Sequence, residues 1–103
     1  MPIKVSKKDG KLNLRVDTDL TIFQVSEVYL QLVAAAEEVT HASIEFIGDI
    51  EIDTAAVQLL LAFKKKLRAS GGELSVNWES EKLDEIFDLF NLKSQFSRLQ
   101  GSN

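Results

Sequence analysis

The order of hydrophobic patterns along the chain predicts an α/β domain with a mixed β-sheet and helices packed mainly on one face. Two short alternating segments flank Asp9 and Gly10, a pair typical of a β-hairpin turn. Helical and strand-like patterns then alternate, so the expected order is β-β-α-β-α-β-α. Strands joined through a helix pair in parallel by right-handed crossovers, whereas hairpin strands are antiparallel, and the sheet is therefore mixed.

The first half of the chain predicts a hairpin followed by a helix. Ile3 alternates with Val5, and then Leu12, Leu14 and Val16 alternate with polar residues. Residues 22–39 predict a helix, because their apolar residues recur at helical spacing and would form one buried stripe. The stripe comprises Val25, Val28, Tyr29, Leu32, Val33, Ala36 and Val39.

The middle of the chain predicts a strand at residues 43–47 and a second helix at residues 54–69. The apolar face of this helix is wide, so we expect it to pack against more than one element. Cations in its last turns suit the negative end of the helix dipole. These cations are Lys64, Lys65, Lys66 and Arg68, and a pair of glycines at 71–72 ends the helix.

The last third predicts a fourth strand and a third helix. Leu74, Val76 and Trp78 alternate as the strand, and Trp78 should pack in the core or at its rim. Ser80 can cap the helix that follows. The apolar face of that helix would comprise Leu83, Ile86, Phe87 and Phe90. After Leu92, Phe96 and Leu99 suggest that the tail docks, so we expect one domain at residues 1–100 and a polar tail at 101–103.

Composition narrows the classes of function. The chain has 103 residues, a formal net charge of −4 and no cysteine, which excludes disulfides and thiolate chemistry. The net negative charge argues against nucleic acid as the main ligand, because binding to phosphates requires a basic surface. Neither a signal-like apolar run at the start nor a segment of about 20 apolar residues is present. We therefore expect a cytoplasmic protein without stable membrane insertion.

The junction between the third predicted strand and the second helix holds the main candidate residue. The helix begins at Asp53 and Thr54, which places the Thr54 hydroxyl in the first turn. The free backbone N–H groups and positive dipole end found there favour an added phosphate. Thr54 is therefore a candidate for regulation by phosphorylation. The structural alternative is a helix cap or first-turn residue with no regulatory role.

Three carboxylates precede this helix. Asp49, Glu51 and Asp53 alternate, so their side chains could converge on one side of an extended segment. Such a cluster can hold Mg²⁺ or Ca²⁺, but three carboxylates without further ligands are more often solvated charges or a contact patch for basic partner residues. We predict neither a metal nor a cofactor.

No motif in the chain points to catalysis. The sequence has no nucleophile elbow, P-loop or dinucleotide-binding glycine pattern. His41, the single histidine, lies in a predicted connection and is expected to be solvated. A metal-dependent enzyme built on the three carboxylates would lack a nucleophile and a general base, so we expect a non-enzymatic protein.

Nearly the whole chain resembles a STAS domain, the module shared by anti-sigma factor antagonists, anion transporter tails and a subunit of bacterial phospholipid ABC transporters. Three stretches carry the resemblance: residues 19–25, residues 44–60 and residues 71–76. The second is similar to the signature in which a strand and a turn lead to Asp-Ser/Thr at a helix start. Two positions depart from this pattern, because Ala56 replaces the usual glycine and Asp49 an apolar turn residue.

The resemblance implies a regulatory binding function. Thr54 matches the hydroxyl that a partner kinase phosphorylates in anti-sigma factor antagonists. The implied partner is an ATP-binding anti-sigma factor with serine kinase activity, and the alternative is a constitutive STAS subunit bound to the ATPase of an ABC transporter. The residues expected to bind the partner are Asp49, Glu51, Asp53, Thr54, Ala55, Val57 and Gln58.

Overall fold

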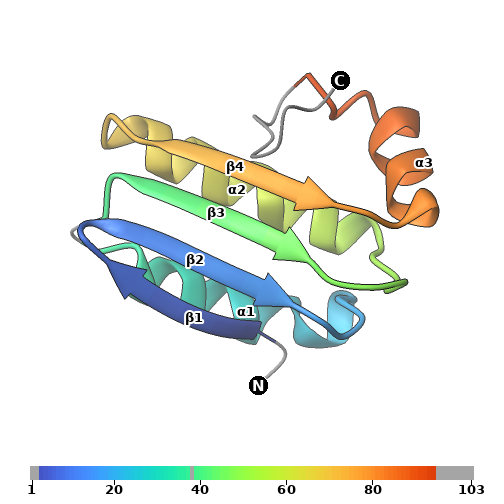
Figure 1. The fold of residues 1–103 in the computed structure, drawn as a ribbon, viewed down its shortest axis with the longest axis horizontal. Helices are drawn as coiled ribbons and strands as arrows, with labels where there is room; N and C mark the ends of the chain where they lie inside the picture. The colour runs from blue at the N-terminus through green and yellow to red at the C-terminus, as the bar shows by residue number, and fades with distance from the viewer. Residues whose placement is uncertain (1–2, 38, 95–103) are drawn as a thin grey trace.

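The computed structural model describes residues 3–37 and 39–94. Its elements are β1 (Ile3–Lys8), β2 (Lys11–Val16), α1 (Ile22–Ala35), β3 (His41–Phe46), α2 (Thr54–Ala69), β4 (Glu73–Trp78) and α3 (Glu81–Leu89). The strands form one sheet in the order β1-β2-β3-β4 (Figure 1). β1 is antiparallel to β2, while β2, β3 and β4 are parallel, which confirms the predicted mixed sheet and element order.

The turn between β1 and β2 sets the register of the sheet. Asp9 and Gly10 have φ angles of 53° and 74°. A two-residue type I′ turn requires positive φ at both positions, which an Asp-Gly pair accommodates. With this turn in place, Leu12, Leu14 and Val16 of β2 all face the core, and the polar residues between them face the other side.

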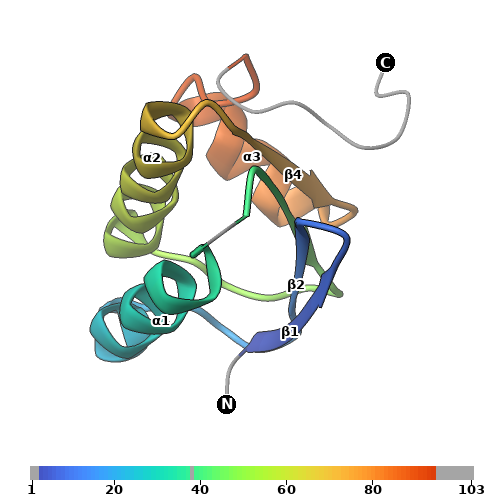
Figure 2. The ribbon, with the colours of Figure 1, turned by 90° about the vertical axis from the view of Figure 1, so that its left-hand side faces the viewer.

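The helices α1 and α2 lie on the same face of the sheet (Figure 2). α2 contacts both α1 and β4, as its wide apolar face predicts. Its buried residues are Ala56, Val57, Leu59, Leu60, Phe63 and Leu67. α3 lies at the carboxyl end of β4 (Figure 1), where the ring of Phe87 packs 4.4 Å from that of Trp78 and 6.2 Å from that of Phe46. Trp78 is therefore a core residue.

The first helix ends earlier than its hydrophobic spacing predicts. α1 ends at Ala35, and the amide of Ala36 donates the last helical bond to the carbonyl of Leu32. The amide of Val39 then donates to the carbonyl of Ala36 in a turn. Because Val39 is still buried, its apolar side chain continues the helical pattern beyond the end of the helix.

Two other expectations are wrong. His41 is the first residue of β3, paired with Lys11 and Glu73, and does not lie in a connection. Phe90 was expected on the buried face of the third helix but is 44% exposed. The reason is that α3 ends at Leu89 and Phe90 forms its C-cap, so the helical spacing no longer applies there.

The end of the chain is described as far as residue 94. Leu92 is buried and its amide donates a 2.7 Å hydrogen bond to the carbonyl of Phe87, which ties this segment to α3. Phe96 and Leu99, which were expected to dock, and the polar residues 101–103 lie outside the described residues. The domain boundary at residue 100 stays a prediction.

Candidate functional site

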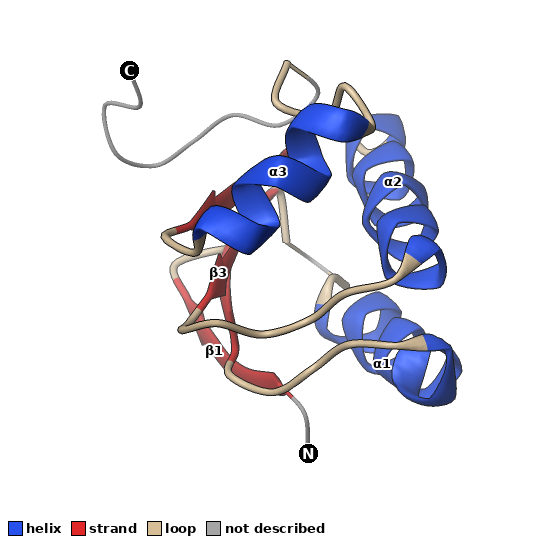
Figure 3. Ribbon diagram, turned by 90° about the vertical axis from the view of Figure 1, so that its right-hand side faces the viewer, coloured by secondary structure: helices blue, strands red, loops and turns tan. Residues whose placement is uncertain are grey.

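Two loops at the carboxyl ends of the parallel strands form the candidate site. One leads from β2 into α1, and the other leads from β3 into α2. Leu20 and Ile52 form a parallel bridge between the loops, and the amide of Leu20 donates to the carbonyl of Glu51 at 2.9 Å. Figure 3 shows the two loops running side by side toward the helices. The starts of α1 and α2 are thereby brought to the same end of the domain.

Asp53 connects the starts of both helices. Its Oδ1 accepts a hydrogen bond from the amide of Ala56 at 3.1 Å, which makes Asp53 the N-cap of α2. Its Oδ2 accepts a second bond, of 2.8 Å, from the amide of Ile22 in the first turn of α1. The positive ends of both helix dipoles favour a carboxylate at this position. One side chain therefore holds two helix N-termini together.

Thr54 is the first residue of α2, and its side chain is exposed. Since Asp53 occupies the N-cap position, the hydroxyl of Thr54 is not the group that caps the helix. It lies in the first turn, where the amide groups and the helix dipole present positive partial charge. The hydroxyl is thus accessible at a position that electrostatically suits a phosphate.

The remaining residues expected in the second helix divide between surface and core. Gln58 is exposed, one turn beyond Thr54, and Ala55 is half-buried. Val57, also expected to bind the partner, is only 3% exposed and packs in the core. Ala56 is completely buried, which means that its methyl group, absent from the glycine usual in the family, faces the core and not an approaching partner.

The three loop carboxylates do not converge. Asp49 Oδ1 accepts a 2.7 Å hydrogen bond from the hydroxyl of Ser80, and Glu51 Oε1 lies 3.5 Å from Lys82 Nζ. Asp53 faces the two helix starts instead. Asp49 and Glu51 thus turn to the start of α3, while Asp53 turns to the starts of α1 and α2, so the expected convergence of all three is wrong. Within the described part of the chain, no three acidic or histidine side chains group as a metal site would require.

Two exposed apolar residues beside the junction were missed by the sequence analysis. Ile22 and Phe23, in the first turn of α1, are 64% and 92% exposed. The amide bond from Ile22 to Asp53 places them next to the start of α2. A signal for them was present, because neither belongs to the buried stripe that begins at Val25, and apolar residues outside that stripe must face solvent.

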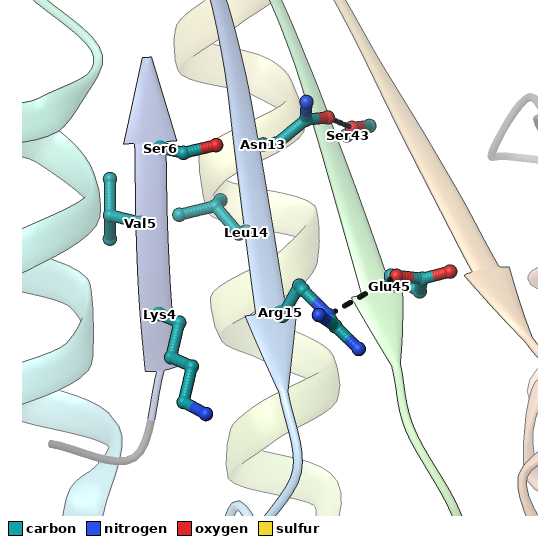
Figure 4. A pocket seen from close by; sticks show the side chains of 8 residues that line it. All are labelled: Lys4, Val5, Ser6, Asn13, Leu14, Arg15, Ser43 and Glu45. Atoms are coloured by element: carbon teal, nitrogen blue, oxygen red, sulfur yellow. Dashed lines mark hydrogen bonds and ion pairs between the residues drawn. The ribbon is translucent and has the colours of Figure 1, made fainter.

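A hollow of about 300 Å³ lies on the face of the sheet opposite α1 and α2 (Figure 4). Its lining comprises Lys4, Val5, Ser6, Asn13, Leu14, Arg15, Ser43 and Glu45. Arg15 Nε lies 3.5 Å from Glu45 Oε1, and the hydroxyl of Ser43 donates to Asn13 Oδ1. These are cross-strand pairs that stabilise neighbouring strands, so sheet pairing accounts for them. The loop junction is the stronger candidate site.

Comparison with known proteins identifies the family to which this chain belongs. A family model described as the Mlab STAS domain matches residues 3–100. The chain belongs to the STAS domain family, which confirms the resemblance read from its residues. No curated protein in the comparison matches the sequence.

Solved structures support the same fold. An anti-sigma factor antagonist from Mycobacterium paratuberculosis aligns over 95% of this chain and 84% of its own, with a TM-score of 0.80 and 17% identity. A candidate antagonist from Thermotoga maritima aligns over 93% and 84%, with a TM-score of 0.83 and 17% identity. The phosphorylated Bacillus cell fate determinant SpoIIAA aligns over 96% and 92%, with a TM-score of 0.72 and 16% identity. At these identities the likeness concerns the fold alone.

Proposed function

We propose that this protein is a regulatory STAS protein, similar to anti-sigma factor antagonists, that binds a partner protein through the strand–helix junction around Thr54. The observation that carries the proposal is the double hydrogen bond of Asp53. It holds the starts of α1 and α2 side by side and leaves Thr54 exposed in the first turn of α2. A surface that is ordered before binding loses little conformational entropy on association.

Phosphorylation of Thr54 would release the partner. A phosphate adds about −1.5 to −2 charges at pH 7. It would stand at the helix N-terminus beside the carboxylates of Asp53 and Glu51, so α2 would tolerate it while the local surface became strongly anionic. In the complex, an apolar partner surface facing Thr54 would strip water from the phosphate, and this desolvation cost, together with repulsion from the neighbouring carboxylates, would release the partner. The orientation of Asp53 away from Asp49 and Glu51, which both contact the start of α3, also favours a binding module over a metal-dependent enzyme.

The phosphorylation step is tested with a purified ATP-binding partner. The protein is incubated with that partner and ATP, and its intact mass is measured. The proposal predicts the gain of a single phosphate on the unmodified protein and no gain on the Thr54→Ala variant. Equal phosphorylation of both proteins, or of neither, would contradict the assignment of Thr54.

A second candidate function is supported by the family model and by the exposed residues of α1. The matching model is the Mlab STAS domain, and the exposed Ile22 and Phe23 offer an apolar contact that needs no phosphorylation. In this case the protein is a constitutive subunit bound to the ATPase of a bacterial ABC transporter. It predicts stable co-purification with such an ATPase in the absence of ATP and weakening by Thr54→Glu. Isolation of the protein free of any ATPase would count against it.

Both candidates place the protein in the cytoplasm, where a kinase or the ATPase of a transporter has access to ATP. Among the helices of the described residues, none combines the length and apolar character needed to cross a bilayer. The two candidates share one docking surface and differ in whether the partner is released by phosphorylation. The gene neighbourhood discriminates between them, since signalling genes favour the first and transporter genes favour the second.

A further inference from the structure

The side chain of Phe23 is exposed, while the backbone on either side of it is held by hydrogen bonds at the start of α1. Phe23 is 92% exposed, whereas the rings of Phe46, Phe63 and Phe87 are fully buried. Thr21 and Gln24 flank Phe23 in the sequence, and Gln24 Oε1 accepts hydrogen bonds from the amide and hydroxyl of Thr21, at 3.0 and 2.7 Å. The backbone of Phe23 is thus held at the start of α1, and an exposed aromatic side chain on an ordered helix start is suited to act as an anchor in an interface.

The segments around this ring carry charge of one sign. Residues 17–27 and 48–58 contain six carboxylates and no lysine or arginine. The carboxylates belong to Asp17, Asp19, Glu27, Asp49, Glu51 and Asp53. Lys4 and Lys82 approach Asp17 and Glu51 from other elements at 3.8 and 3.5 Å, but these pairs are solvent-exposed and contribute little. The exposed ring therefore has an acidic surround.

Cations collect at the opposite end of the domain. Lys7, Lys8 and Lys11 lie at the β1–β2 turn, which is the far end of the strands from the candidate site. The last turns of α2 carry Lys66 and Arg68, at the opposite end of the helix from Thr54. This separation of charge orients the acidic end toward an approaching basic surface.

We infer that Phe23 inserts into an apolar pocket of the partner and that basic residues border this pocket. The inference rests on the proposed docking at Thr54 and adds the anchor and the chemistry of the opposing surface. Charge complementarity argues for a basic partner. It argues against a second copy of this chain, because a symmetric dimer through this surface would set one acidic surround against another.

Photocrosslinking tests the contact directly. A photoreactive phenylalanine analogue is introduced at position 23, at position 54 or, as a control, at position 89, where the native leucine is 79% exposed on α3. Each full-length protein is irradiated in the cells it comes from, and the crosslinked peptides are sequenced. The inference predicts that positions 23 and 54 crosslink to the same protein and that position 89 does not crosslink to it. The peptide joined to position 23 should be apolar with flanking lysine or arginine.

Each alternative result has a definite meaning. Crosslinking from position 54 without position 23 would overturn the anchor and leave the proposed function standing. Crosslinking from position 23 without position 54 would support the anchor and contradict docking centred on Thr54. A product containing two copies of this chain, an acidic peptide at position 23, or no product from either position would overturn the inference.

Affinity measurements with the crosslinked partner provide the second readout. Phe23→Ala should weaken binding by at least about tenfold, the loss expected of an aromatic anchor, while Leu89→Ala should change it less than about twofold. Added salt should slow association of the wild-type protein. The inference is overturned if Phe23→Ala binds as tightly as Leu89→Ala or if salt leaves the association rate unchanged. Circular dichroism of both variants confirms that the comparison is made between folded proteins.

Discussion

The carboxylate of Asp53 accepts a hydrogen bond of 2.8 Å from the amide of Ile22, a residue 31 positions earlier in the sequence. The same carboxylate caps α2 through the amide of Ala56. A residue that marks a helix start in the sequence is therefore also the link between two helices. This link organises the surface on which Thr54 and Phe23 are exposed.

Removing the Asp53 carboxylate should destabilise the fold in two separable steps. Asp53→Ala loses the N-cap and the bond to Ile22, with an expected loss of about 2–3 kcal/mol in unfolding free energy. Asp53→Asn retains an oxygen for the cap of α2 but not a second acceptor, so its loss should be about 1 kcal/mol smaller. Urea denaturation of the three proteins measures both steps. Equal stability of the Asn variant and the wild type would contradict the second hydrogen bond, and equal stability of the Asn and Ala variants would contradict the cap.

Substitutions of Thr54 should change binding without unfolding the protein. The Thr54 side chain is exposed and does not cap the helix, so Thr54→Ala should change the unfolding free energy by less than about 0.5 kcal/mol. Thr54→Glu places a negative charge at a helix N-terminus, which is neutral or stabilises by about 0.3–1 kcal/mol. Thermal unfolding measures both effects. A large destabilisation of either variant would show that Thr54 has a structural role.

Ser80 should contribute to stability by joining the loop of Asp49 to α3. Its hydroxyl donates to Asp49 at 2.7 Å and accepts from the amide of Leu83 at 3.3 Å. Ser80→Ala should lose about 1–2 kcal/mol in urea denaturation. The matched control is Ser26→Ala on the exposed side of α1, which should be neutral or stabilising by about 0.5 kcal/mol because alanine favours helices. Similar losses for both variants would contradict this role.

Because Gly72 lies close to Thr40, replacing this glycine should strongly destabilise the fold. A Cβ atom at position 72 would lie 1.6 Å from the carbonyl oxygen of Thr40, so Gly72→Ala must displace backbone. The expected loss is about 3 kcal/mol or more. Gly10→Ala is the control. An alanine there adopts a positive φ, which costs about 1–2 kcal/mol, but the added Cβ meets no atom within 4 Å. Chemical denaturation that ranks Gly10→Ala as the more harmful change would contradict the packing described.

The element order and sheet type could be predicted because they depend on local patterns. Asp9 and Gly10 specify the hairpin, and the helical stripes force crossovers between the later strands. The start of α2 was predicted correctly at Thr54, since an Asp before an apolar helical stripe is a strong N-cap signal. The end of α1 was missed because the buried Val39 extends the stripe past the helix.

The details of the candidate site depend on tertiary contacts that spacing along the chain does not encode. The hydrogen bond from Ile22 to Asp53 depends on the bridge between two loops. The directions of Asp49 and Glu51 are set by Ser80 and Lys82 on a later element, so alternation alone wrongly suggested convergence.

The position of a residue on its helix also determines whether its side chain is exposed at the candidate site. Val57 lies in the matching signature, but the face of α2 on which it stands packs into the core. The functional interest of Phe23 depends on the neighbouring start of α2, which its own helix does not reveal. Sequence similarity to a signature therefore identifies the segment, while the structure selects the residues within it that a partner can reach.

The most direct test of the account is affinity capture with three tagged forms of the protein: wild type, Thr54→Ala and Thr54→Glu. Captured proteins are identified and quantified by mass spectrometry, and reciprocal binding is measured with the purified partner. The account predicts that wild type and Thr54→Ala retain the same ATP-binding protein and that Thr54→Glu loses it while staying folded. Equal retention by all three forms would contradict a docking surface centred on Thr54.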